Sequence, residues 1–407
     1  MSTQSARIFL FRIHQWIGLN ICIVLGIIFA SGTLLVFANE VEAWFYLDRT
    51  SAAEQASSPP TYGKIYDTLH AAYPDARIYV LRKSSGHDLL GDRATLIAPG
   101  GRKFEVRTDG ATGEILGASP VEGVKAALRA FHDSLFSGHI IGRLAVTAFA
   151  FALLVSIVTG LISYRRFWRG AFRLPDRRRG PRGWWGGMHR LLAVWSIPFL
   201  LVMALTGIYY FVAEFKILPK ERLTAKPVAE RMEALPPGFN GASVERAIEA
   251  AQTVFPGFQP GYIILPLKKH QGIAMAGKAD DTGVTLLKNT ILIDPSGYSV
   301  LRSQSVAETS ILLSHKLLAE IFHHGHWGGL PTRVLWFLFG AIGTVLLFAG
   351  AMVYASRVAH LPRAGTTAPE RRSAFGSLWH GMFIGKWALI PAAAIVACIG
   401  IWRYVLM

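Results

Sequence analysis

The sequence contains little of the chemistry on which secreted domains and soluble enzymes depend. Among its 407 residues there are only two cysteines, Cys22 and Cys398, and both lie in apolar runs. We therefore expect neither a disulfide framework nor a thiolate metal site. Charged residues are also scarce, at 17% of the chain, whereas hydrophobic residues make up 52%. These proportions exclude an ordinary soluble enzyme.

Five long runs of the chain are almost free of charge. A helix needs about 20 mostly apolar residues to cross the hydrocarbon core of a membrane. The runs that meet this condition are 15–38, 142–164, 190–213, 333–356 and 386–405. The sequence therefore predicts a polytopic membrane protein, a helical bundle of about five transmembrane helices.

Acidic residues are scarce where the basic ones are densest. The net charge is +16, and residues 165–190 carry nine arginines against one acid, Asp176. Short loops rich in Lys and Arg stay on the cytoplasmic side, and this places the N-terminus in the cytoplasm. The long segments 39–131 and 214–331 mix both signs, as translocated domains can. The basic excess is a topology signal with some contact to lipid headgroups, and it does not indicate nucleic-acid binding.

Two parts of the chain repeat one pattern. HQWIGLNICIVLGIIFASG and HRLLAVWSIPFLLVMALTG each place a hydroxyl residue 17 positions, and a glycine 18 positions, after the first histidine. The residues that recur in this way are His14, Ser31 and Gly32 in one copy and His189, Thr206 and Gly207 in the other. FHDSLFSG at 131–138 matches FHHGHWGG at 322–329, and the following runs end alike, in VTGLISYRR and FAGAMVYASR. We infer an internal duplication, in parallel orientation.

The segments between the paired runs also match. Residues 61–118 and 242–303 each contain a helical pattern followed by alternating strands with hairpin signals. The predicted fold is thus a membrane α-helical bundle with two periplasmic α+β domains. The expected segments are transmembrane helix 1–39, periplasmic domain 40–130, transmembrane helix 131–165, basic cytoplasmic loop 166–188, transmembrane helix 189–213, periplasmic domain 214–322, transmembrane helix 323–357, cytoplasmic loop 358–384 and transmembrane helix 385–407.

Four histidines occupy repeated positions at the ends of the predicted spans. His14 and His189 lie at the cytoplasmic ends, and His132 and His323 lie at the outer ends. A single histidine at an interface is more often a polar anchor than a ligand, but the repetition favours a shared role. Two histidines that face each other in a bundle can be the axial ligands of a haem iron. Two such pairs would form a path for electrons across the membrane.

Two further features bear on this hypothesis. The chain has no CxxCH sequence, so a haem would be bound without a covalent link, as haem b. Small residues in the spans would allow a flat macrocycle to approach closely, although ordinary helix packing explains them equally well. These residues are Gly18, Gly26, Gly32, Gly160 and Gly207.

The ordered motifs resemble those of a known family, the PepSY-associated transmembrane proteins, which include siderophore-iron reductases of the bacterial inner membrane. The motifs are HQWIGL at 14–19, FHDSLFSGHIIGR at 131–143, HRLLAVW at 189–195 with ALTG at 204–207, and FHHGHWGG at 322–329. The resemblance covers nearly the whole chain. It implies periplasmic PepSY domains and, in the reductase members, two b-type haems that carry electrons to a ferric siderophore. It also implies that His14, His189, His132 and His323 are the haem ligands.

The chain departs from the family pattern in one respect. Reductases carry one histidine near the fourth span, in a pattern like LHTG, whereas this chain has FHHG followed by His326. His139 and His326 are therefore a second candidate pair for the outer haem, and His380 and His360 compete for the inner one. His324, His326 and Trp327 are expected to form a rim where the ferric substrate approaches.

Three classes of function are compatible with the sequence. The first is an oxidoreductase that takes electrons from a quinol or a soluble cytoplasmic donor, since no GxGxxG fingerprint is present for a dinucleotide. It would reduce a ferric chelate, because Fe(III) is held by oxygen donors more tightly than Fe(II). The second is a non-enzymatic PepSY membrane protein that binds or regulates a periplasmic partner. The third is a metal transporter, which the apolar middles of the spans disfavour.

Overall fold

The computed structural model describes residues 3–44, 61–83, 91–121, 123–137, 140–164, 166–215, 235–267, 271–279, 289–305 and 311–358. The predicted fifth span, 386–405, lies outside these residues. Contacts divide the chain into two units. The first comprises Met1–Phe37, Ala127–Leu218 and Ala319–Met407, and the second comprises Ala38–Ala126 and Pro219–Leu318.

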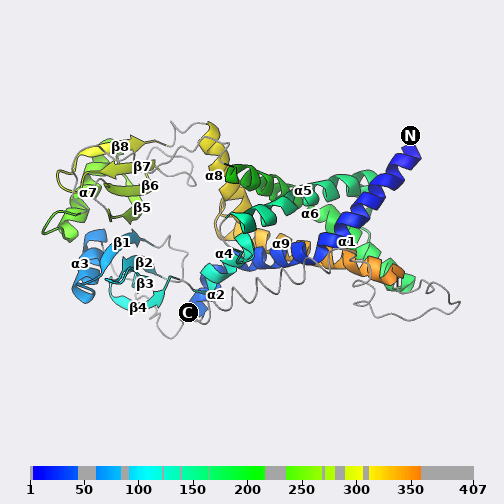
Figure 1. Cartoon of the computed structure of the whole chain (residues 1–407), viewed down its shortest axis with the longest axis horizontal. Coiled ribbons are helices and arrows are strands. Elements are labelled where there is room, and N and C mark those ends of the chain that lie inside the picture. The colour runs from blue at the N-terminus through cyan, green and yellow to red at the C-terminus, as the bar shows by residue number, and fades with distance from the viewer. Residues whose placement is uncertain are drawn as a thin grey trace. The chain divides into compact units, whose positions relative to one another are not determined.

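The first unit is helical (Figure 1). Its helices are α1 (Thr3–Val36), α5 (Ile141–Ser163), α6 (Gly180–Glu214) and α9 (Leu330–Val358), with short 3-10 turns at Phe167–Gly170 and Arg177–Arg179. It also includes α4 (Val124–Ser134) from Ala127 onward and α8 (Ile311–His324) from Ala319 onward. Four of them, α1, α5, α6 and α9, are long and apolar enough to cross a membrane. They coincide with the first four predicted runs, and the chain is a membrane protein.

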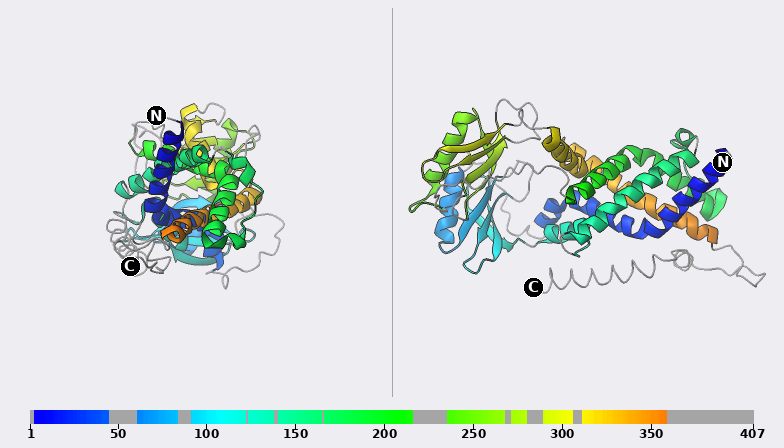
Figure 2. Two further views of the ribbon diagram at one scale, coloured as in Figure 1. Left: turned by 90° about the vertical axis from the view of Figure 1, so that its right-hand side faces the viewer. Right: turned by 45° about the horizontal axis from the view of Figure 1, so that its top comes forward.

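The four long helices form a bundle in which α1 and α6 are diagonal to each other. α1 packs against α5 and α9, and α6 packs against the same two helices (Figure 2). The centre of the bundle is filled by large apolar side chains around Phe199, which is 7% exposed. Phe199 stacks on Phe339 with ring centres 5.8 Å apart and meets Trp336 and Phe29 edge-on. This aromatic cluster holds the two diagonal helices at a fixed separation.

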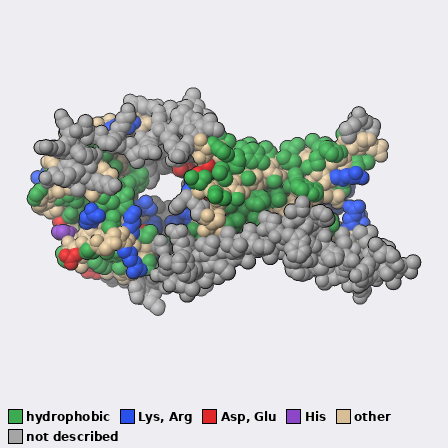
Figure 3. Space-filling model, in the orientation of Figure 1, with side chains coloured by type: hydrophobic (Ala, Val, Ile, Leu, Met, Phe, Trp, Pro, Cys, Tyr) green, Lys and Arg blue, Asp and Glu red, His purple; other side chains and the backbone are tan. Residues whose placement is uncertain are grey.

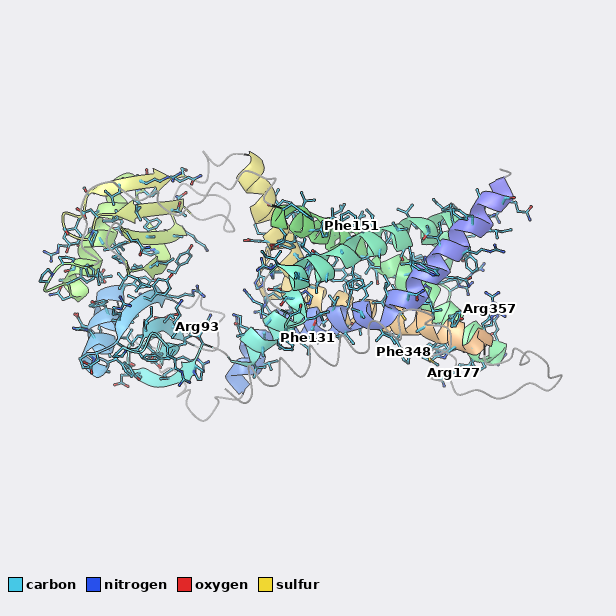
Figure 4. The ribbon with its side chains drawn as sticks, viewed as in Figure 1. Arg93, Phe131, Phe151, Arg177, Phe348 and Arg357 are labelled. Atoms are coloured by element: carbon cyan, nitrogen blue, oxygen red, sulfur yellow. The ribbon has the colours of Figure 1, made fainter. Side chains whose placement is uncertain are left out.

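The surface of the bundle separates apolar from basic side chains. Apolar atoms cover most of its visible face, and Lys and Arg gather at the end where α1 begins (Figure 3). Arg177 and Arg357 lie at this same end (Figure 4). The Arg177 guanidinium lies over the ring of Trp184, at 4.9 Å, so this end combines cations with an interfacial aromatic residue. Such a combination is typical of the boundary between lipid and water.

The short helices α4 and α8 stop before the spans that follow them. α4 ends at Ser134, and the next residues, Leu135 and Phe136, have φ angles of 49° and 59°. α8 ends at His324, and Gly325 has a φ of 68°. A residue in the left-handed region ends a helix. The spans therefore begin only at Ile141 and Leu330, later than the expected starts at 131 and 323.

The second unit is one antiparallel sheet with helices against it. The elements are α2 (Ala38–Trp44), α3 (Tyr62–Ala72), β1 (Arg77–Arg82), β2 (Asp92–Ile97), β3 (Lys103–Thr108), β4 (Ile115–Pro120), α7 (Gly241–Val254), β5 (Gln259–Ile264), β6 (Ile273–Lys278), β7 (Asn289–Ile293) and β8 (Val300–Gln304). The strand order is β4-β3-β2-β1-β5-β6-β7-β8. Each half contributes a helix followed by four strands, and the halves join where β1 pairs with β5.

The helices α3 and α7 cap each other reciprocally. The backbone N–H of Gly63 donates to the carboxylate of Glu245 at 2.6 Å, and that of Gly241 donates to Asp67 at 2.7 Å. Carboxylates at helix N-termini satisfy orphan donors and interact favourably with the helix dipole. The backbones approach so closely that a Cβ on Gly63 would lie 2.5 Å from the Gly241 carbonyl oxygen. Only glycine fits at these two positions.

We expect Gly63→Ala to destabilise the α3–α7 contact by about 1–3 kcal/mol, because the new methyl group overpacks a contact made by backbone atoms. Hydrogen exchange of the full-length protein, followed in peptides from 62–72 and 241–254, measures the effect. Gly100→Ala is the matched control, since a Cβ there meets nothing within 4 Å. Equal protection in both variants would contradict the close approach.

Candidate functional site

The structure brings the four repeated histidines together in two pairs. His14 on α1 and His189 on α6 have ring centres 6.2 Å apart, across the diagonal of the bundle. His132 on α4 and His323 on α8 have ring centres 6.3 Å apart. Figure 4 labels Phe131, the residue before His132. The two pairs thus have nearly the same separation, although they are built from different helices.

Three of these histidines contact a backbone carbonyl of a neighbouring helix through Nδ1. The contacts are His14 to Ser156 at 3.0 Å, His189 to Leu346 at 3.2 Å and His132 to Ile28 at 3.0 Å. A carbonyl oxygen can only accept a hydrogen bond, so Nδ1 carries the proton in each case. In the neutral ring Nε2 then keeps its lone pair, the form that binds a metal.

The fourth histidine reaches the same state through a hydroxyl group. The Thr206 hydroxyl donates to the carbonyl of Val202 at 2.7 Å, which uses its only proton. It must therefore accept from Nδ1 of His323, 2.8 Å away. Ser31 repeats this arrangement, because it donates to Ile28 at 2.9 Å and lies 3.2 Å from Nδ1 of His132. The hydroxyl residues of the sequence repeat, on α1 and α6, thus orient the histidines of α4 and α8.

Burial keeps the His132–His323 pair neutral. Desolvation lowers the pKa of His132, and it holds the pKa of His323 well below its ordinary value. The neighbouring His324 and His132 lower the pKa of His323 further, since two positive charges so close repel each other. A neutral imidazole is the form required of a metal ligand.

Glycines of neighbouring helices make room for three of the four imidazoles. A Cβ on Gly32 would lie 2.7 Å from Cε1 of His132. At Gly160 it would lie 3.2 Å from His14, and at Gly350 3.1 Å from His189. Gly160 and Gly350 occupy matching places in VTGLISYRR and FAGAMVYASR. The sequence repeat could therefore have identified Gly350, which was not among the predicted glycines.

The remaining glycines of the original set do not contact histidine. A Cβ on Gly207 would meet Ala150 at 2.7 Å, which is ordinary helix packing. At Gly18 and Gly26 it would meet nothing within 4 Å. Of the five glycines singled out in the sequence, Gly32 and Gly160 are thus the two that lie against a paired histidine, and their role in admitting a macrocycle stays a prediction.

The separation of each pair matches two imidazoles on one metal ion. A bond from a histidine nitrogen to zinc is about 2.0–2.1 Å long, and with iron bonds of similar length two ring centres on one ion lie about 6 Å apart. The observed values are 6.2 and 6.3 Å. At each position the donor set, two imidazoles whose Nδ1 atoms are hydrogen-bonded to a neighbouring helix, fits a bis-histidine haem. The role of these residues as haem ligands stays a prediction.

The other predicted site residues lie near the His132–His323 pair or outside the described residues. His324 and His326 are exposed, and their ring centres are 5.9 Å apart. Trp327 is 40% exposed, and its ring centre lies 6.0 Å from that of Trp336. His139, His360 and His380 lie outside the described residues. Among the described residues no group of three or more His, Cys, Asp and Glu is arranged to hold a bare metal ion.

His326 does not lie on the same helix as His323, because α8 ends at His324 and Gly325 turns the chain. An α-helix continuing through His326 would place His326 on the face of His323, and the turn at Gly325 prevents this. The ring of His324 instead lies beside both neighbouring rings, with its centre 5.5 Å from that of His323 and 5.9 Å from that of His326. Its Nδ1 lies 2.7 Å from the carbonyl of Glu320. The cluster thus extends from the buried pair to the surface.

The chain belongs to the PepSY-associated TM region family, whose model matches residues 11–357. The matched range includes all four paired histidines, the whole of the second unit, and the first unit from residue 11 to residue 357. The chain is also similar to an uncharacterized protein of Pseudomonas aeruginosa, with 37% identity over 76 residues. That similarity covers 19% of each protein.

We expect Gly32→Ala to displace the His132 ring and to destabilise the bundle by about 1–3 kcal/mol, as overpacking does. Gly26→Ala on the same helix is the control, since open space surrounds that position and alanine favours a helix more than glycine. Thermal unfolding of the detergent-solubilised protein measures both. A loss of stability of the same size in Gly26→Ala would contradict a specific contact with His132.

Proposed function

We propose that the chain is an inner-membrane di-haem b-type oxidoreductase that passes electrons across the membrane to a ferric siderophore on the periplasmic side. The observation that carries this proposal is the geometry of the two histidine pairs. Their ring centres are 6.2 and 6.3 Å apart, and all four Nδ1 atoms already have acceptors. Histidines that only anchor a helix at the membrane surface need neither a partner histidine at this distance nor an acceptor on Nδ1.

His14 and His189 would hold one haem, and His132 and His323 would hold the other. When bound, haem b supplies reversible one-electron chemistry at its iron. The carbonyls of Ser156 and Leu346 orient the first two imidazoles, and Thr206 orients His323. Acceptors that take the Nδ1 proton in a hydrogen bond raise the basicity of a histidine ligand and fix its tautomer. The protein thus presents four pre-organised nitrogen donors.

The two pairs lie at different depths in the bundle. His14 and Ser31, which contacts His132, are 17 residues apart on α1, about 26 Å at 1.5 Å per residue. The hydrocarbon core of a membrane is about 30 Å thick. The apolar cluster around Phe199 lies between the two pairs along α1 and α6. This arrangement supports transfer from one face of the membrane to the other.

The basic end of the bundle supports the proposed orientation. Arg177 and Arg357 lie where α1 begins (Figure 4), and Lys and Arg remain on the cytoplasmic side. The His14–His189 pair is then the entry point for electrons from a quinol or a soluble donor. The second unit is then periplasmic, and its matching halves, joined at β1 and β5, support a duplicated PepSY-like domain.

The products follow from the balance of electrons. Each ferric ion takes one electron, so a quinol that gives two electrons and two protons reduces two ferric chelates. Oxygen donors hold Fe(II) less tightly than Fe(III), so reduction loosens the chelate. His324, His326 and Trp327 lie on the exposed side of the His132–His323 pair, and we assign them to the rim that the chelate approaches.

We predict that the purified protein, reduced with dithionite, shows the α and Soret bands of haem b, with two haems per chain. His323→Ala should remove one centre and leave the other, because the pairs use different helices. His189→Ala should remove the complementary centre. Absorption spectroscopy combined with a haem assay measures both.

His70→Ala is the control, because His70 is exposed and contacts Tyr66 in the second unit. It should retain both haems. Protein from haem-sufficient cells that carries no haem would overturn the proposal and would favour a non-enzymatic membrane protein that binds a periplasmic partner. Retention of both centres in His323→Ala would show that the ligands are other residues.

A further inference from the structure

A polar stripe runs along α6 outward from the His132–His323 pair. Thr206, Tyr210 and Glu214 are spaced four residues apart, so they lie above one another on one face of the helix. Thr206 orients His323, and Glu214 forms an ion pair with Arg143. Both ends of the stripe thus have partners.

Tyr210, the middle residue of the stripe, has no hydrogen-bond partner for its hydroxyl group among the described residues. The Tyr210 hydroxyl is buried and makes no hydrogen bond within the described part of the chain. Its ring lies against His323, with ring centres 5.3 Å apart and ring planes at 86°. A buried hydroxyl without a partner costs folding free energy, and native structures rarely contain one without a reason.

We propose that the Tyr210 hydroxyl donates a hydrogen bond to a carboxylate of the haem held by His132 and His323. This inference rests on the proposed function. A haem b carries two carboxylates on one edge, and a polar edge is most stable when it faces away from the centre of the membrane. Tyr210 is one helical turn beyond Thr206 in that direction, toward Glu214 and Arg143.

The charges around Tyr210 explain why a donor is needed there. The carboxyl groups of Asp133 and Glu320 lie within electrostatic reach of the phenol, and a further carboxylate would be repelled by them. A hydrogen bond to a charged acceptor is stronger than one between neutral groups and offsets that repulsion. The hydroxyl is buried, so a chelate arriving from solvent does not reach it without displacing its surroundings.

The two halves of the bundle differ at this position. On α1, Ser31 corresponds to Thr206, and the residue four positions later is Leu35. Only α6 therefore offers a phenol, and the proposal assigns it to one carboxylate of one haem. A purely structural tyrosine does not require its hydroxyl to lie beside the histidine pair.

The test is Tyr210→Phe in the full chain, with Tyr209→Phe as the control. Tyr209 is the neighbouring tyrosine, and the centres of the two rings are 5.8 Å apart. In haem-free protein, Tyr210→Phe should melt at the same or a higher temperature, because it removes an unpaired buried hydroxyl. To observe one haem alone, both tyrosine variants are combined with His189→Ala. Compared with His189→Ala alone, the double variant with Tyr210→Phe should bind the remaining haem about 10- to 100-fold more weakly, as expected for the loss of a hydrogen bond to a charged group.

A second measurement is the midpoint potential of that haem. A hydrogen bond to a carboxylate weakens its negative field at the iron, so Tyr210→Phe should lower the potential, and Tyr209→Phe should not. Unchanged haem affinity and unchanged potential in Tyr210→Phe would overturn the inference while leaving the proposed function intact. Absence of haem from the wild-type protein would overturn both.

Discussion

The hydrogen bond on Nδ1 of each paired histidine is the interaction on which the rest of the site depends. It fixes the proton on Nδ1, so that in the neutral ring Nε2 keeps the lone pair with which an imidazole binds a metal. Carbonyls of Ser156 and Leu346 perform this task for His14 and His189, and the hydroxyl of Thr206 performs it for His323. Because the acceptors belong to neighbouring helices, the packing of the bundle also determines which nitrogen of each imidazole carries the proton.

Close packing supplies the second constraint. An imidazole at the helix–helix boundary needs room, and Gly32, Gly160 and Gly350 provide it, each on a helix next to the histidine it faces. Glycine serves a similar purpose in the second unit, where Gly63 and Gly241 bring α3 and α7 into backbone contact. In both units, then, glycines set the distance between elements that must meet.

Much of this arrangement could be predicted from the sequence. The apolar runs predicted the four described spans, and the repeated histidines predicted which residues meet. The end of α8 could not be predicted, because FHHGH reads as a helical continuation until Gly325 takes a positive φ. The role of Thr206 was also hidden, since its partner His323 is 117 residues away. In the predicted repeat the position of Tyr210 corresponds to Leu35, and it takes the structure to identify the Tyr210 hydroxyl as unpaired among the described residues.

We propose that each pair of histidines binds one iron through two neutral imidazoles. Near-infrared magnetic circular dichroism of the oxidised full-length protein can decide this, because its charge-transfer bands identify both axial ligands of low-spin ferric haem. Both haems should give the band of two imidazoles. A high-spin spectrum, a band typical of another ligand, or the absence of haem would refute the proposal.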